Sequence, residues 1–194
     1  IGDGRFGFEA AGRDPNQALV VDPELVWSTY LGSAGLGQGD TAWAVAVGQN
    51  GDVTVTGTTD DWTSFPTTPG AFQSTIGQLG SIFVTRLDAA QGQLVYSSLI
   101  GAGADRPLGI SVDSSGRAAV VGWTSLPSFP VTPGAFDTVK STNPVVGRSS
   151  AVVFRLGPVG TTLEYSTYLD CVLGSEAYGV ALLDTGQVIV GGEA

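Results

Sequence analysis

The sequence predicts an all-β fold built from a repeated unit of four antiparallel strands, and three observations lead to this prediction. One strand-like motif occurs three times, beginning at Leu25, Leu94 and Leu163, so successive copies are 69 residues apart. A long fixed period indicates one supersecondary unit stacked on copies of itself. Short apolar runs alternate with clusters of Gly, Ser and Thr, as in chains of many short strands. Finally, no segment sustains the apolar spacing of a long helix.

The strands of each copy follow from alternating apolar runs and from the turns between them. An X-Gly pair, which favours a tight hairpin, separates the first two runs of each copy: Asn50-Gly51, Ser115-Gly116 and Thr185-Gly186. The third copy contains only the first two strands. The predicted ranges are about 43–48, 52–58, 81–88 and 93–100, then 108–113, 117–124, 150–157 and 162–169, then 178–183 and 187–192.

The first strand of each copy alternates small and large residues in the same way. Ala44-Val45-Ala46-Val47 aligns with Gly109-Ile110-Ser111-Val112 and with Gly179-Val180-Ala181-Leu182. Period-2 alternation places the small residues on one face and the branched residues on the other. A crowded innermost strand in a four-stranded unit is typical of the blades of a β-propeller. We therefore predict a β-propeller-type array of antiparallel blades, incomplete or open, with two complete blades and partial ones.

A long insertion, roughly 59–80 and 125–149, separates the second and third strands of the two complete copies. Within it, Thr68-Pro69 and Thr132-Pro133 resemble an N-cap followed by proline, which predicts one short helical turn. Four aromatic residues are expected to attach these loops to the blades, with ligand contacts as the alternative: Phe65, Phe72, Phe129 and Phe136.

The chain is expected to divide into two parts. Residues 1–22 do not fit the repeat and are predicted to be lead-in strands, at about 4–11 and 18–22, that end an upstream segment. Residues 23–194 are predicted to be propeller repeats. Their units are a blade at about 43–100, a blade at about 108–169 and a partial blade at 178–194.

Three motifs recur in order along the chain: the Tyr165-Ser-Thr-Tyr-Leu strand, the run at 109–116 and the loop Phe-Pro-Thr-Thr-Pro-Gly-Ala-Phe at 65–72. Together they resemble the SBBP family of bacterial β-propeller repeats. The resemblance covers about residues 23–194 and implies a propeller fold and an extracytoplasmic location (secreted, cell-surface or periplasmic). It supplies no catalytic motif. The chain departs from the family at Asp170-Cys171, where the family favours Gly-Gly, and in a shortened connection at 101–108.

Composition excludes several classes of function. The net charge of −10 argues against a nucleic-acid partner, which would need clustered Lys and Arg. The absence of histidine removes Ser-His-Asp and Cys-His catalysis and every histidine-containing zinc site. The single cysteine, Cys171, permits no intramolecular disulfide, and no apolar run approaches the ~20 residues of a membrane-spanning helix. We expect no catalytic residue, no metal and no cofactor.

One loop remains a candidate ligand site. Asp60, Asp61 and Trp62 place two carboxylates beside an aromatic ring, as some sugar sites do, although solvated loop acids are the simpler interpretation. The sequence favours a non-enzymatic scaffold or protein-interaction module, whose partner is a protein or further repeats of the same polypeptide. Two alternatives stay open. One is an accessory subunit docked peripherally on the outer face of a membrane or cell-surface assembly, and the other is a carbohydrate-binding or carbohydrate-active propeller.

Overall fold

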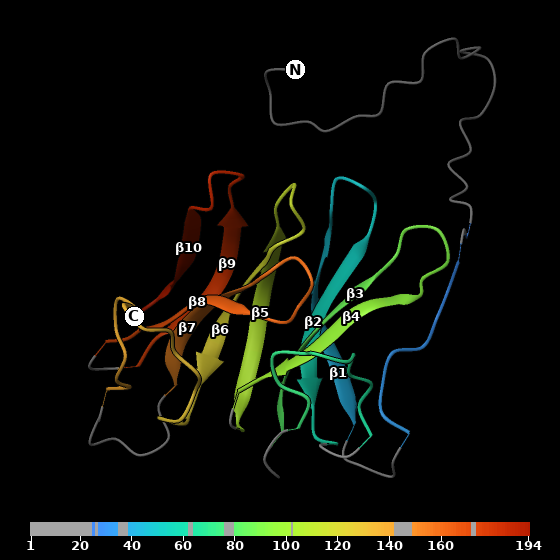
Figure 1. Ribbon diagram of the computed structural model, residues 1–194. Helices are drawn as coiled ribbons and strands as arrows, with labels where there is room; N and C mark the ends of the chain where they lie inside the picture. The colour runs from blue at the N-terminus through green and yellow to red at the C-terminus, as the bar shows by residue number, and fades with distance from the viewer. Residues whose placement is uncertain are drawn as a thin grey trace, which may run out of the picture.

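The computed structural model describes residues 25, 27–34, 39–61, 64–75, 80–101, 103–141, 149–171 and 174–194, and within them the chain forms ten strands and no helix. The strands lie in three antiparallel sheets (Figure 1). Sheet 1 has the order β1-β2-β3-β4, sheet 2 the order β5-β6-β7-β8, and sheet 3 pairs β9 with β10. The strands are β1 (Asp40–Val47), β2 (Val53–Thr59), β3 (Ser81–Leu87), β4 (Leu94–Ile100), β5 (Asp105–Val112), β6 (Ala118–Thr124), β7 (Ser150–Leu156), β8 (Leu163–Leu169), β9 (Glu176–Leu182) and β10 (Val188–Glu193).

The predictions of an all-β fold and of a four-stranded antiparallel unit are confirmed. The first strand of each sheet, however, begins two or three residues earlier than predicted, at Asp40, Asp105 and Glu176. A register shift near the start of each of these strands explains the difference. In β1, Ala42 pairs with Gly57 and Ala44 with Thr56 of β2, so Trp43 between them is left without a partner in the ladder. The same irregularity occurs in the β5–β6 and β9–β10 pairs. A bulge interrupts the two-residue alternation, so the sequence pattern does not predict the part of the strand that precedes it.

The predicted helical turns in the long loops are wrong, because these segments form β-turns. The Ala71 N–H donates to the Thr68 carbonyl at 3.1 Å, and Gly70 has a φ of 78°. Proline followed by a glycine of positive φ defines a type II turn. The Thr68 hydroxyl does not cap a helix, since it accepts a hydrogen bond from the N–H of Ser97 on β4 at 3.1 Å. The turn at 132–135 has the same hydrogen bond and the same φ.

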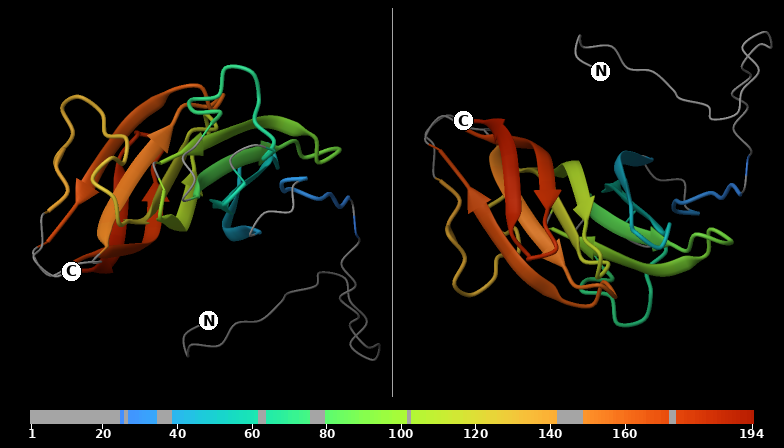
Figure 2. Two further views of the ribbon diagram at one scale, coloured as in Figure 1. Left: turned by 90° about the horizontal axis from the view of Figure 1, so that it is seen from below. Right: turned by 90° about the horizontal axis from the view of Figure 1, so that it is seen from above.

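The sheets are stacked face to face in chain order (Figure 2). We call the face of a sheet that points to the following sheet its forward face, and the opposite one its rear face. The forward face of sheet 1 packs on the rear face of sheet 2 to form the main core. Partly buried Ile110 and Val112 of β5 border this core. Its fully or almost fully buried members are Ile82, Val84, Tyr96, Ile100, Ala118, Val120, Phe129, Val152, Phe154, Leu156 and Tyr168.

The forward face of sheet 2 packs on sheet 3 in the same manner. Val121, Ala151 and Val153 are buried there with Ala177 of β9, and Val180, Val188 and Val190 cover them. The first strands of the three sheets, β1, β5 and β9, therefore follow one another side by side. Their small residues were expected to be equally crowded. The three positions are not equivalent: Ala46 and Ser111 are half-buried, whereas Ala181 is exposed because no described sheet follows sheet 3.

One glycine opposite the bulge in each first strand makes room for the bulged backbone. A Cβ on Gly57, Gly122 or Gly192 would collide with a backbone carbonyl of the bulged strand, that of Thr41, Arg106 or Glu176. The bulge turns this carbonyl across the neighbouring strand, and only a residue without a side chain leaves room for it.

This geometry predicts a strong position-dependence for alanine substitution. Gly122→Ala should lower the free energy of unfolding by about 3 kcal/mol, because the methyl group overlaps the Arg106 carbonyl. The matched control is Gly191→Ala, a strand glycine whose Cβ would point into open space, and it should change stability by no more than about 0.5 kcal/mol. Urea denaturation in dilute solution measures the free energy of unfolding of both variants. Equal losses of stability in Gly122→Ala and Gly191→Ala would show that the Arg106 carbonyl is not fixed against Gly122.

Candidate functional site

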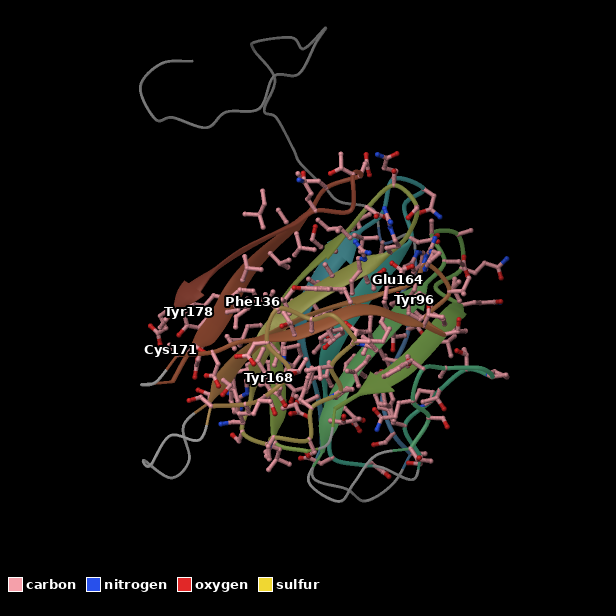
Figure 3. The ribbon with its side chains drawn as sticks, turned by 60° about the vertical axis from the view of Figure 1, so that its left-hand side comes forward. Tyr96, Phe136, Glu164, Tyr168, Cys171 and Tyr178 are labelled. Carbon is pink, nitrogen blue, oxygen red and sulfur yellow. The ribbon has the colours of Figure 1, made fainter. Side chains whose placement is uncertain are left out.

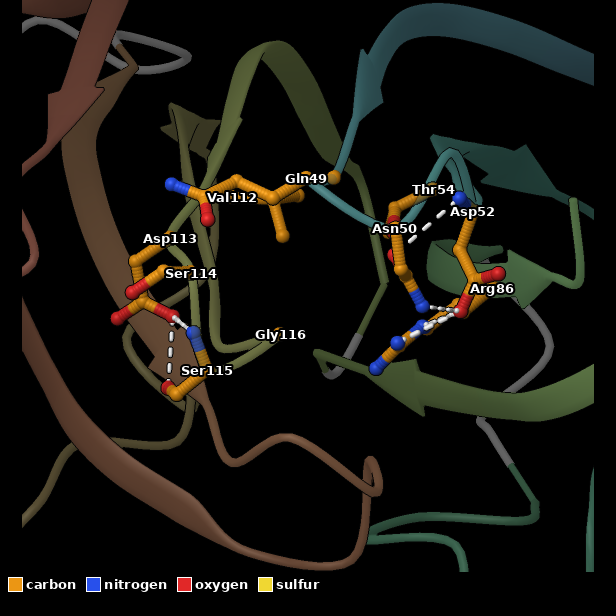
Figure 4. Close-up of a pocket in the computed structure, with 11 residues that line it drawn as sticks. Gln49, Asn50, Asp52, Thr54, Arg86, Val112, Asp113, Ser114, Ser115 and Gly116 are labelled. Atoms are coloured by element: carbon orange, nitrogen blue, oxygen red, sulfur yellow. Dashed lines mark hydrogen bonds and ion pairs between the residues drawn. The ribbon is translucent and has the colours of Figure 1, made fainter.

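A polar cleft separates the β1–β2 turn from the β5–β6 turn, at one end of sheets 1 and 2 (Figure 4). Its volume is about 380 Å³. Each turn is closed by a backbone hydrogen bond, from Gly51 to the Gly48 carbonyl at 2.9 Å and from Gly116 to the Asp113 carbonyl at 3.0 Å. The X-Gly pairs of the sequence thus fix both walls of the cleft.

Asp52 organises the wall that belongs to sheet 1. Its carboxylate accepts hydrogen bonds from Asn50 Nδ2 at 2.7 Å, from the Ala89 N–H at 3.0 Å and from Arg86 Nε at 2.9 Å, and Arg86 Nη2 approaches to 2.6 Å. Burial raises the pKa of Asp52, but the hydrogen bonds from Asn50, Arg86 and Ala89 outweigh it, so the pKa lies below its ordinary value. The carboxylate is therefore ionised and fully engaged at neutral pH.

Asp113 has the equivalent role in sheet 2. Its carboxylate accepts hydrogen bonds from the Ser115 hydroxyl at 2.7 Å and from Arg117 Nε at 2.6 Å. Burial raises the pKa of Asp113, but the hydrogen bonds from Ser115 and Arg117 outweigh this effect, so the pKa lies below its ordinary value. The neighbouring Ser114 N–H donates to the carboxylate of Asp184 in the β9–β10 turn at 2.8 Å, so this wall is also attached to sheet 3.

Two equivalent arginines join each sheet to the next. Arg86 Nη1 donates to the Pro158 carbonyl of sheet 2 at 3.2 Å, and its guanidinium lies against Gly116. Arg155 Nη1 donates to the Gly186 carbonyl of sheet 3 at 2.6 Å, while Nε pairs with Glu164 at 3.0 Å. Sequence reasoning missed both residues. The signal was present, because an Arg-Leu pair recurs with the period of the repeat at 86–87 and 155–156 in a chain with eight basic residues.

The charged groups of the cleft are thus used to hold the protein together. Asp52 and Asp113 both have an arginine partner, and Arg86 also reaches the following sheet. Within the described ranges, no group of three or more His, Cys, Asp and Glu side chains could hold a metal ion. The cleft is best described as a polar seam between two sheets.

The predicted ligand loop lies at the opposite end of β2 from this cleft. Asp60 is exposed directly after the strand, whereas Asp61 is 8% exposed and its carboxylate accepts the Ser64 hydroxyl at 2.7 Å and the Ser64 N–H at 3.1 Å. Asp61 therefore shapes its own loop. Trp62 lies outside the described residues. The structure does not bring the two acids to the cleft.

The loop aromatic residues have different environments. Phe65 stacks on Phe83 with ring centroids 4.7 Å apart, and Phe129 is buried in the main core beside Tyr168, as expected for residues that attach the loops. Phe72 packs against the main core as well. The prediction fails for Phe136, which is 83% exposed (Figure 3).

Cys171 is half-buried at the end of β8. Its thiol donates to the Gly174 carbonyl at 2.8 Å. Cys171 is therefore a small residue with a structural contact just beyond the strand end.

Comparison with known proteins assigns no family to the chain, since no protein-family model and no curated protein sequence matches it. None of the described residues belongs to a helix that is long and apolar enough to cross a membrane. The interpretation of the seam and of the sheet faces therefore rests on their own geometry.

The Asp52–Arg86 pair predicts a defined acid dependence of stability. Because the pKa of Asp52 is lowered in the folded state, its contribution to the free energy of unfolding is complete above the unfolded pKa near 4 and is lost as the pH falls through the lower folded value. Arg86→Gln should destabilise the protein by about 1–3 kcal/mol at pH 7 and flatten this decline.

Arg106→Gln is the matched control, since its guanidinium lies over the Trp43 ring at 4.3 Å rather than beside Asp52. It should keep the wild-type dependence on pH. The stability of wild type, Arg86→Gln and Arg106→Gln is measured by thermal unfolding at a series of pH values between 7 and 2. Parallel curves for wild type and Arg86→Gln would contradict the assignment.

Proposed function

We propose that the chain is a non-enzymatic, extracytoplasmic scaffold or protein-interaction module of the β-propeller type, in which each four-stranded sheet is a blade. The observation that carries this proposal is that every described sheet uses a broad, mainly apolar face to bind its neighbour. Such faces are the means by which repeat proteins associate with other elements. The side-by-side order of β1, β5 and β9 supports the arrangement of blades around their first strands.

The resemblance of the repeated loops and strands to SBBP repeats supports the same class and is the basis for the extracytoplasmic location. Contacts within the chain oppose an enzymatic role for the polar seam, because its carboxylates are held by arginines and backbone N–H groups. A general acid or a nucleophile needs a group that is available to the substrate.

The carbohydrate alternative depends on Asp60 and Asp61. Asp61 supports its own turn through Ser64, which leaves Asp60 as the exposed acid of the described pair. A glycosidase needs two carboxyl groups placed across the scissile bond. We therefore rank the scaffold above the carbohydrate-active protein.

The proposal predicts protein contacts at the sheet faces and no chemistry at the acidic loop. A photo-cross-linking residue placed at Ile189 or Val45, both exposed on sheet faces, should yield protein adducts in the producing cell. The same residue placed at Asp60 should yield none. Purified protein should neither hydrolyse nor bind glycans in an array, and Asp60→Asn should behave as wild type. Glycan turnover abolished by Asp60→Asn would replace the proposal with the carbohydrate alternative.

A further inference from the structure

Two joints between sheets within the chain are built in the same way. In each joint the forward face of one sheet covers the rear face of the next. At the joint between sheets 1 and 2, the Tyr96 ring of sheet 1 also covers the hairpin glycine Gly160 of sheet 2. In front of sheet 1, the Trp27 ring covers the hairpin glycine Gly92 in the same way. Trp27 precedes sheet 1 and is equivalent to Tyr96 in the repeated motif. The segment 27–31 thus occupies the place of a fourth strand in front of sheet 1.

The C-terminal end of the stack presents an uncovered forward face. Gly179, Ala181, Ile189 and Gly191 share this face of β9–β10, and all four are exposed, Ile189 by 59%. The equivalent position in sheet 2, Gly109, is closely covered, since a Cβ there would lie 2.8 Å from the Tyr178 carbonyl. A Cβ on Gly179 or Gly191 would meet nothing within 4 Å.

At the N-terminal end of the stack, the described residues leave part of the rear face of sheet 1 uncovered. Val45 and Val47 of β1 are 62% and 65% exposed, whereas their equivalents Ile110 and Val112 in sheet 2 pack against the main core. The segment 27–31 covers only the part of sheet 1 near Val55 and Phe83, and a cleft of about 270 Å³ lies between them. The part of this face formed by β1 is therefore left open by the residues that the structure describes.

These two ends are complementary halves of one further joint. β9 and β10 are the first and second strands of a unit, and the segment 27–31 stands at the position of a fourth strand. The exposed residues in the middle of the two faces are small or apolar, namely Val45, Val47, Gly179, Ala181, Ile189 and Gly191, while Glu193 at the end of β10 shares the forward face of sheet 3. Packing β9–β10 on β1 would bury small residues of one sheet against branched apolar residues of the other, as the two internal joints do.

We propose that a second copy of this chain docks head to tail, with the forward face of β9–β10 in one copy packed on the Val45–Val47 face of sheet 1 in the other. This inference rests on the proposed function and names the partner of its sheet faces. A contact between different surfaces of identical chains is heterologous, so it produces closed rings or open chains. Because each copy carries a net charge of −10, added salt should strengthen the association.

Sedimentation velocity of the full chain from 1 to 100 µM tests the proposal. Wild type should form dimers or larger species as the concentration rises. Val45→Asp should block one half of the joint and Ile189→Asp the other, so each variant alone should stay monomeric, with at least a tenfold loss of affinity. An equimolar mixture of the two should form a one-to-one complex and nothing larger, because each variant retains the half that the other lacks.

Val159→Asp is the matched control, since Val159 is 61% exposed on the β7–β8 turn, outside both faces, and this variant should associate as wild type does. Circular dichroism of each variant checks that the exposed substitutions leave the fold intact. A wild-type chain that stays monomeric at 100 µM overturns the inference, and so does association that survives both variants or a mixture that does not form the complex. None of those results contradicts the proposed function. That proposal would instead be overturned by glycan turnover, or by the absence of protein adducts at the two sheet faces.

Discussion

The fold depends on one constraint, which is that a four-stranded sheet with apolar residues on both faces must be covered on both sides. Sheet 2 meets this requirement: its rear face contributes Val120, Val152 and Phe154 to the main core, and its forward face buries Val121 and Val153 under sheet 3. Neither cluster could form from a single sheet, because the alternation along a strand sends neighbouring residues to opposite sides. Stacking is therefore a condition for the stability of each repeat.

Polar contacts set how the stacked sheets are placed relative to one another. Apolar faces can slide, since the hydrophobic effect has no direction. Arg86 and Arg155 limit such movement because each donates to a carbonyl of the following sheet. The Leu182 N–H adds a further link at 3.0 Å to the hydroxyl of Ser111, one of the small residues on β5. These directional bonds lie at the hairpin ends and on the first strands.

The same polar contacts explain why the cleft between the turns is a poor candidate for catalysis. Asp52 lies between Asn50, Arg86 and Ala89, and a carboxylate with several donors is stabilised in its charged form. Its charge is therefore part of the structure. The end faces, with exposed apolar residues such as Val45 and Ile189, are the surfaces on which we propose that partners bind.

The sequence by itself determined the strand order within each repeat, the hairpins and the two faces of each strand, because period-2 alternation and X-Gly turns are local properties. It did not reveal the bulge at Trp43, which interrupts the alternation, or the type II turn at 68–71, whose proline and glycine also fit a helix start. It likewise placed Phe72 and Phe136 in the same environment, although one is packed and the other exposed. Only the tertiary structure decided these points and the roles of Arg86 and Arg155. They depend on contacts between segments that are distant in the sequence, such as the 31 residues between Arg155 and Gly186 and the 72 residues between Arg86 and Pro158.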